Sequence, residues 1–195
     1  MGKFISWLLI ITGGVLLAFG GWKIYDTNQQ TTHSLAEAKE IVGNQLETTD
    51  EEKKVEAEKF TPGVGDVIGV LELPTIDAEL PIVEGTDPDD LEKGVGHYKG
   101  SYYPDETGQI VLSGHRDTVF RKAGDLKIGD QIKVQMPYGE YTYEILDTKI
   151  VDKDDTSIIT LQSEKEELLI TTCYPFSYVG DAPERYIIYA EKIEG

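Results

Sequence analysis

Cysteine occurs only once in this chain of 195 residues, at Cys173. A single thiol excludes an intramolecular disulfide and a zinc site built from several cysteines. Basic residues are also scarce, because 18 Lys and Arg stand against 36 Asp and Glu and give a formal net charge of −18. Nucleic-acid binding requires clustered cations, so this balance argues against a nucleic-acid partner. The three histidines, His33, His97 and His115, are too far apart for a local metal motif.

The remaining residues contain no cofactor motif. Neither glycine pair, at residues 63–65 or 94–96, opens a long helix after a strand, and this excludes a nucleotide-binding loop. Acidic side chains between residues 154 and 167 could converge on Ca²⁺, which takes several oxygen ligands, but a solvated loop is the favoured interpretation. We therefore expect no bound cofactor.

Charged residues are absent from residues 4–22, which lysines flank on both sides. At about 1.5 Å rise per residue, a helix over this run nearly spans the ~30 Å hydrocarbon core of a bilayer. Trp7 and Trp22 lie near its ends, as interfacial aromatic residues do. A cleaved signal peptide is the alternative, but the run is long for a signal core. We predict an uncleaved single-pass anchor over residues 1–25, with the rest of the chain outside the cell membrane.

Residues 26–62 are polar and charged and are predicted to form a partly helical stem. Ser34 and Glu37 match a capping box, and apolar residues recur at helical spacing from Leu35 to Leu46. The apolar stripe is thin, which favours a solvated stem that lifts the domain off the membrane. The alternative is an arm that packs against the domain and regulates it.

From residue 63 onward, short apolar and β-branched segments alternate with Gly, Pro and Asp turns. A short helix is predicted at residues 87–94, and Asp117 or Thr118 is predicted to cap another that runs to Gly124. Strands are predicted at residues 67–76, with a break at Pro74, and at residues 79–84, 109–115, 131–136, 141–151, 168–173 and 182–190. Residues 94–98 are predicted to lead into another extended piece. Many short strands without an internal repeat indicate an all-β domain over residues 63–195, a closed or nearly closed antiparallel barrel. Strand propensity alone does not distinguish this barrel from a sandwich.

The lone thiol lies at the end of one of these predicted strands. Residues 168–173 form an apolar, β-branched run, and Pro175 favours an end to the strand there. Cys173 is then held at a rigid strand tip, where its side chain can reach a groove. The alternative is a small, inert, buried side chain, which is common for free cysteine.

Two more strand ends carry polar groups suited to thiol chemistry. His115 follows an apolar strand, and Arg185 begins another. In acyl transfer a thiolate attacks, an imidazole exchanges the proton and a fixed cation stabilises the oxyanion. Arginine stays protonated, so we assign His115 as general acid/base and Arg185 as the oxyanion and substrate clamp. The alternatives are a structural histidine and an ion pair of Arg185 with Glu184 or Asp181.

These motifs resemble the sortases, the cell-wall cysteine transpeptidases of Gram-positive bacteria. The resemblance rests on Ser-Gly-His-Arg at residues 113–116, Thr-Cys at residues 172–173 and the downstream Arg185. The run from Cys173 to Arg185 is most similar to class D sortases, and the similarity covers roughly residues 65–193. Leu169 departs from the common Thr-Leu-x-Thr-Cys pattern. The sequence shows no C-terminal membrane span and no aspartate-aromatic lid before the barrel, which argues against the pilin-polymerising branch.

The resemblance implies a closed eight-stranded sortase-type β-barrel and a membrane-anchored transpeptidase. Such an enzyme cleaves an LPXTG- or LPXTA-like signal after its threonine through a thioester at Cys173. The implied partners are surface proteins with a C-terminal LPXTG-like signal and a peptidoglycan precursor that supplies the acceptor amine. A cysteine peptidase outside the cytoplasm and a non-catalytic, membrane-tethered binding barrel are the alternatives.

Four further residues are predicted to bind substrate. Thr172 precedes the thiol directly. His97 resembles a second histidine found upstream in sortases, and in this chain we interpret it as structural or pocket-lining. Ile158 and Ile159 form an apolar patch in a polar loop. They line a substrate groove or, alternatively, plug one end of the barrel.

Overall fold

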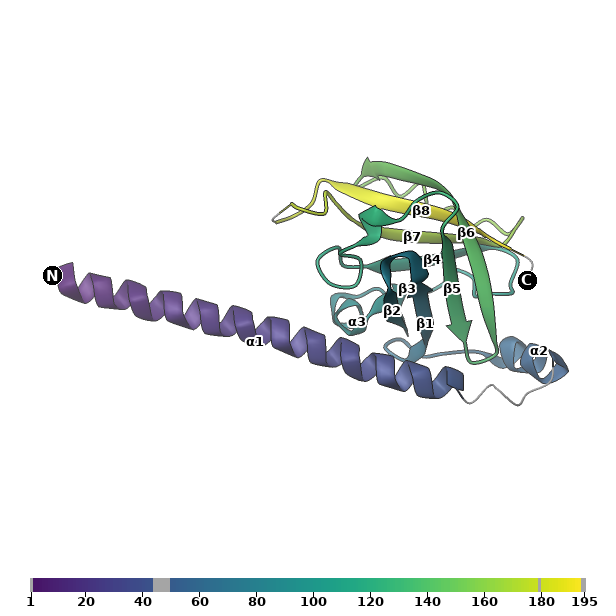
Figure 1. Cartoon of the computed structure of the whole chain (residues 1–195), viewed down its shortest axis with the longest axis horizontal. Coiled ribbons are helices and arrows are strands. Elements are labelled where there is room, and N and C mark those ends of the chain that lie inside the picture. Colours follow the sequence, from purple (N-terminus) through teal and green to yellow (C-terminus); the bar gives the residue numbers. More distant parts are fainter. Residues whose placement is uncertain (1, 44–49, 179, 194–195) are drawn as a thin grey trace.

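The computed structural model describes residues 2–43, 50–178 and 180–193. A long helix, α1 (Gly2–Gly43), leads to a β-barrel, with a second helix, α2 (Asp50–Lys59), between them. The apolar N-terminal half of α1 extends away from the barrel, and the second half lies along it (Figure 1). The apolar side chains are exposed, and Leu17 keeps 80% of its surface. By length and composition, α1 can cross a membrane.

The second half of α1 packs against the barrel. Ala38 is fully buried and Ser34 is only 5% exposed. Thr31 Oγ1 donates a hydrogen bond to the backbone carbonyl of Glu92, at 3.2 Å. The capping-box prediction is wrong, because the helix runs without a break through Ser34. This part of the stem is therefore not a solvated spacer, and Leu46 of the predicted stripe lies outside the described residues.

Eight strands close into a barrel, and this confirms the predicted fold class. Around the barrel their order is β1-β2-β3-β4-β7-β8-β6-β5. A short helix, α3 (Pro88–Lys93), forms where acidic residues follow a proline. The strands are β1 (Val67–Leu73), β2 (Ala78–Glu84), β3 (Val95–His97), β4 (Gln109–Gly114), β5 (Gln131–Met136), β6 (Gly139–Asp152), β7 (Glu167–Tyr174) and β8 (Glu184–Lys192).

The prediction that all neighbouring strands run antiparallel is wrong at two places. β2 pairs with β3 in parallel, and β4 pairs with β7 in parallel. Parallel neighbours need a crossover connection, and the whole β5–β6 hairpin lies in the chain between β4 and β7. The parallel pairing places the C-terminal ends of β4 and β7 side by side.

The helix predicted after Asp117 is also absent from the described structure. Turns follow β4, and they lead to one turn of 3₁₀ helix at Ala123–Asp125. Phe120 is fully buried, and a Cβ added at Gly114 would come within 2.6 Å of its ring. The chain doubles back tightly to seat Phe120 over Gly114, and this burial takes precedence over helix formation.

The strands β4, β7 and β8 bury both of their faces. Their inward side chains, such as Ile110, Ile170 and Ile188, belong to the core inside the barrel. A second cluster on the outer face contains Val111, Leu169 and Ile187, and Ile158 and Ile159 of the β6–β7 loop pack on it. Burial on both faces explains why these strands are nearly continuous apolar runs.

Candidate active site

The ends of three adjacent strands bring Cys173, His115 and Arg185 together. Cys173 in β7 is directly paired with Arg185 in β8. Gly114, the last residue of β4, is paired with Thr172 of β7, so His115 follows one residue beyond this pair. All three side chains are partly exposed. The thiol, the imidazole and the guanidinium are thus gathered at one end of the barrel.

Strand alternation points the thiol to the outer face of the barrel. Successive side chains face opposite sides of a sheet, so Cys173 shares the face of Leu169 in the outer cluster. Thr172 faces inward, is 4% exposed and donates a hydrogen bond from Oγ1 to the carbonyl of Gly114 at 2.7 Å. Its hydroxyl therefore ties β7 to β4. This burial contradicts its predicted contact with substrate.

The Arg185 guanidinium is held by backbone carbonyls. Nη1 donates to the carbonyl oxygens of Ala182 and Glu184, at 3.2 and 3.0 Å. Asp181 instead pairs with Lys153 at 3.1 Å, and their hydrogen bond raises the pKa of Lys153. Arg185 forms no ion pair within the part of the chain that the structure describes. Its positive charge remains available to an anion, as an oxyanion clamp requires.

Arg116 contacts the connection between the thiol strand and the arginine strand. Its Nη2 donates to the carbonyl of Gly180 at 2.8 Å, and its guanidinium lies 5.8 Å from the ring centroid of Tyr178. Arg116 follows His115 directly, as the last residue of the Ser-Gly-His-Arg run. Its two contacts link the end of β4 to the chain between Cys173 and Arg185.

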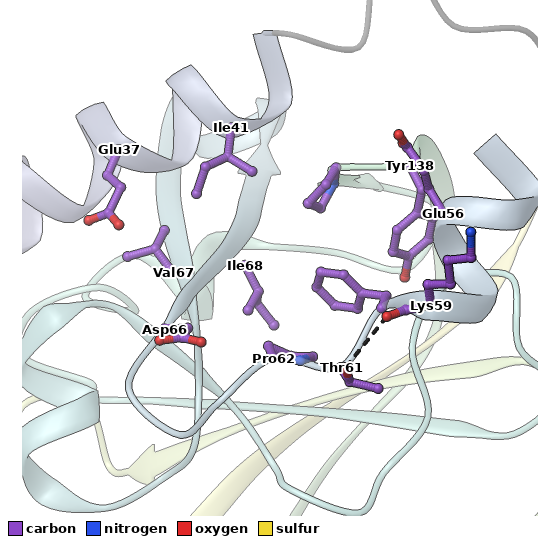
Figure 2. A pocket seen from close by; sticks show the side chains of 12 residues that line it. Glu37, Ile41, Glu56, Lys59, Thr61, Pro62, Asp66, Val67, Ile68 and Tyr138 are labelled. Atoms are coloured by element: carbon purple, nitrogen blue, oxygen red, sulfur yellow. Dashed lines mark hydrogen bonds between the residues drawn. The ribbon is translucent and has the colours of Figure 1, made fainter. Parts of the chain in front are cut away.

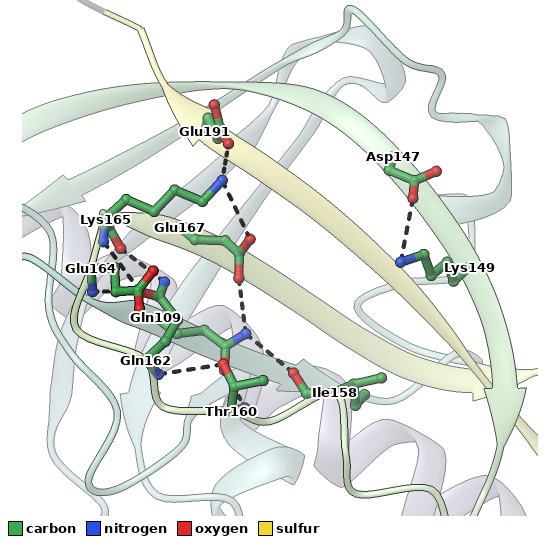
Figure 3. A network of polar contacts seen from close by, with 10 residues as sticks. All are labelled: Gln109, Asp147, Lys149, Ile158, Thr160, Gln162, Glu164, Lys165, Glu167 and Glu191. Atoms are coloured by element: carbon green, nitrogen blue, oxygen red, sulfur yellow. Dashed lines mark hydrogen bonds and ion pairs between the residues drawn. The ribbon is translucent and has the colours of Figure 1, made fainter.

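Gln109 fastens the β6–β7 loop, which covers the outer cluster, to the barrel (Figure 3). Its Nε2 donates to the carbonyl of Ile158 at 3.2 Å and to Glu167 Oε2 at 2.9 Å. Its Oε1 accepts from the backbone amides of Thr160 and Leu161, at 2.9 and 3.1 Å. Gln109 is 1% exposed, so its side-chain amide forms its hydrogen bonds within this network and not with solvent. The network holds the Ile158–Ile159 patch over the face that carries the thiol.

Replacing Gln109 with leucine should raise KM for a substrate about tenfold while kcat changes less than threefold, because the four hydrogen bonds of Gln109 are lost. The expected loss in substrate binding is roughly 1–2 kcal/mol. The loop loses its anchor, but the strand ends stay in place. Steady-state kinetics on Gln109→Leu checks this, with Gln131→Leu on an exposed strand position as the control. A fall in kcat with an unchanged KM would contradict the role given to the loop.

His97 lies in a buried polar network, away from the protein surface. It is 1% exposed, and its Nδ1 lies 2.7 Å from Glu84 Oε2. Its Nε2 lies 3.0 Å from Ser101 Oγ and 3.0 Å from the carbonyl of Tyr102. The ring stacks on Tyr103 with centroids 4.4 Å apart. This enclosure contradicts the predicted substrate contact of His97 and makes it part of the barrel's internal framework.

Three acidic side chains of residues 154–167, those of Asp155, Glu166 and Glu167, take part in separate hydrogen bonds. Glu166 accepts from Tyr143 at 2.6 Å and pairs with Lys192 at 3.2 Å. Burial, reinforced by Glu166, raises the pKa of Tyr143. Hydrogen bonds from Ser157 lower the pKa of Asp155. Within the described ranges, no three His, Cys, Asp or Glu side chains are gathered to hold a metal ion.

A cavity of about 670 Å³ lies between α1, α2, β1 and the β5–β6 turn. Phe60, Ile68 and Tyr138 supply its apolar wall, and Glu37 and Glu56 approach from the helices (Figure 2). None of the three candidate catalytic residues lines this cavity. It is therefore separate from the strand ends that carry the thiol.

Comparison with known proteins identifies the family. A model of the sortase domain matches residues 71–193. This chain is a member of the sortase family. Sortase D of Bacillus subtilis (strain 168) is 59% identical over 197 residues, which cover 99% of this chain and 100% of that protein. Among solved structures, the sortase D5 transpeptidase of Clostridium perfringens matches with a TM-score of 0.71 and 28% identity, over 85% of this chain and 99% of that one.

A sortase C of Clostridium perfringens also matches, with a TM-score of 0.69 and 25% identity, over 82% of this chain and 99% of that one. The resemblance found in the sequence is thereby confirmed. The chain is a sortase-family cysteine transpeptidase, and its similarity to sortase D extends over nearly its full length. Sortases are membrane-associated enzymes that act on surface proteins carrying sorting signals, and the long apolar half of α1 is consistent with an anchor.

Proposed function

We propose that this sortase cleaves an LPXTG- or LPXTA-like signal after its threonine and transfers the new carboxyl end to an amino group of a peptidoglycan precursor. One observation carries the proposal. Cys173 and Arg185 are direct cross-strand partners, and His115 follows the Gly114–Thr172 pair beside them. The three groups that acyl transfer needs therefore meet on one end of a rigid barrel.

In the first half-reaction, the Cys173 thiolate attacks the backbone carbonyl carbon of the signal's threonine. The carbonyl oxygen of this threonine becomes negatively charged, and the Arg185 guanidinium stabilises the charge. The carbon–nitrogen bond then breaks, and the His115 imidazolium donates its proton to the leaving amine. A thioester between Cys173 and the threonine carbonyl remains.

In the second half-reaction, an acceptor amine attacks the thioester carbonyl, and neutral His115 removes the proton that the amine loses. The carbon–sulfur bond breaks, the thiolate of Cys173 is restored, and an amide joins the surface protein to its acceptor. Water would give hydrolysis at the same step. An extended peptide held against the outer face, with Ile158 and Ile159 beside it, orients the carbonyl for attack.

We further propose a division of the chain that places this reaction outside the cell. Residues 1–25 form a single-pass membrane anchor, residues 26–62 form the stem and residues 63–195 form the catalytic domain. The positive-inside rule supports a cytoplasmic N-terminus. The packing of α1 on the barrel makes the stem an extension of the domain.

Product analysis tests the function. The full chain, in nanodiscs, is incubated with LPXTG- and LPXTA-type peptides with and without an amine, and the products are identified by mass spectrometry. Ligated product is expected. Cleavage without ligation would favour the peptidase instead. Folded protein that gives no product, and whose Cys173 reacts slowly with iodoacetamide, would favour the non-catalytic binding barrel.

A further inference from the structure

The candidate active-site end of the barrel points in the same direction as the apolar half of α1. β7 ends and β8 begins at the end of the barrel beyond which this half of α1 extends (Figure 1). The helix is continuous, and Lys23 pairs with Glu92 of α3 at 2.5 Å. Since α1 is fixed against the barrel, the proposed anchor would turn the strand ends that carry Cys173 and Arg185 toward the membrane.

A groove of about 990 Å³ opens between α1 and the loop that follows His115. Lys23, directly after the apolar run, is its first lining residue on the helix. Arg121 and Lys122 line it from the loop. The loop is tied to His115 by a hydrogen bond from the Phe120 amide to the His115 carbonyl, at 3.0 Å. The groove therefore connects the emerging anchor with the segment that carries the candidate acid/base.

The loop is basic in a chain that is otherwise strongly acidic. Four basic and two acidic residues lie between positions 116 and 127, whereas the chain has a net charge of −18. The ionisable residues that line the groove are Lys23, Asp77, Asp117, Arg121 and Lys122. The net charge of this set is positive.

The two loop cations are not neutralised by carboxylates. Arg121 donates from Nε and Nη2 to the backbone carbonyl of Asp117, at 3.0 and 2.7 Å, which fixes its guanidinium. Within residues 2–43, 50–178 and 180–193, neither Arg121 nor Lys122 forms an ion pair. Thr27 and Asn28 of α1 place further polar groups in the groove.

We propose that this groove binds the phosphate of an anionic glycerophospholipid and thereby docks the active-site end of the barrel on the membrane. The inference rests on the anchor of the proposed function, which brings the groove to headgroup level. Cations near an anionic leaflet attract its lipids. Ile24 and Val119 give the groove an apolar side that suits the start of the acyl chains. Docking confines the reaction to substrates presented close to the membrane surface.

Hydrogen exchange on the full chain tests the proposal. The protein is placed in nanodiscs of phosphatidylcholine with increasing phosphatidylglycerol, and amide exchange of residues 117–127 is followed by mass spectrometry. Slower exchange with phosphatidylglycerol is expected. In Arg121→Gln and Lys122→Gln, half-maximal protection should need about fivefold more of this lipid for each cation removed. Lys149→Gln, which replaces an exposed cation outside the groove, should behave as wild type.

Equal exchange in the two lipids, or protection that survives in the Arg121→Gln/Lys122→Gln double variant, would overturn the proposal. Ligation of a soluble peptide to a soluble amine in pure phosphatidylcholine nanodiscs is measured in parallel. This activity reports the proposed function alone and should be unchanged in the double variant. Lipid protection without ligation would refute the proposed function and leave the lipid site standing. A chain that does not enter nanodiscs would refute the anchor and the lipid site together.

Discussion

Replacing Cys173 with alanine should eliminate both the acyl-enzyme and the ligated product, because the chain contains no second thiol. The thioester adds the mass of the peptide's acyl part to the wild-type protein, and intact-protein mass spectrometry detects it. The variant should fold normally, since the side chain is only partly buried and alanine removes a single sulfur atom. Ligation that persists in folded Cys173→Ala protein would rule out the thiol as nucleophile.

Replacing His115 or Arg185 should lower the activity less than replacing Cys173, and kinetic measurements should distinguish the two variants. His115→Ala should lower kcat/KM roughly 10²–10⁴-fold, the usual contribution of general acid–base catalysis. Arg185→Ala should lower kcat roughly 10²–10³-fold, as the loss of an oxyanion-stabilising group does. His33→Ala, an exposed histidine on α1, and Lys149→Ala, an exposed cation on β6, are the matched controls. Losses below about tenfold at His115 or Arg185 would contradict their proposed roles.

The strands of the site could be predicted because their residues carry strong local signals. β4, β7 and β8 are apolar runs, and His115, Cys173 and Arg185 lie at their ends. The parallel pairing of β4 with β7 could not be predicted, because strand propensity is the same for both directions. That pairing is decided when the barrel closes, through contacts between residues distant in the chain.

Burial was the other property that local patterns did not reveal. Thr172 and His97 have residue types common at sites, but the completed barrel encloses both. The thin stripe on α1 was sufficient for packing because Ala38 allows close approach to the barrel. Gln109 was missed because a single amide in an apolar strand carries no motif. Its four partners come from the β6–β7 loop and the start of β7, which only the folded chain brings close.

Replacing His97 with alanine should destabilise the barrel by roughly 3–5 kcal/mol, the usual cost of removing one partner from a buried ionisable pair. Glu84 is 2% exposed, and among the described residues its carboxyl group would keep only the hydroxyl of Tyr103 as a hydrogen-bond partner, at 3.1 Å. Ser101 would lose one of its partners as well. Denaturant unfolding of the wild type and the variant measures the difference in free energy of unfolding.

A double-mutant cycle separates the pair from simple loss of packing. Glu84→Gln keeps the shape of residue 84 and one acceptor oxygen without the charge of the carboxylate, so it should cost less than His97→Ala. Combined with His97→Ala, it should add less than its own effect, because the His97–Glu84 pair is already broken and Glu84→Gln then removes an unpaired buried carboxylate. His33→Ala should stay within about 0.5 kcal/mol of wild type, as exposed substitutions do. Additive losses would mean that Glu84 and His97 stabilise the barrel independently, although 2.7 Å separates Oε2 from Nδ1.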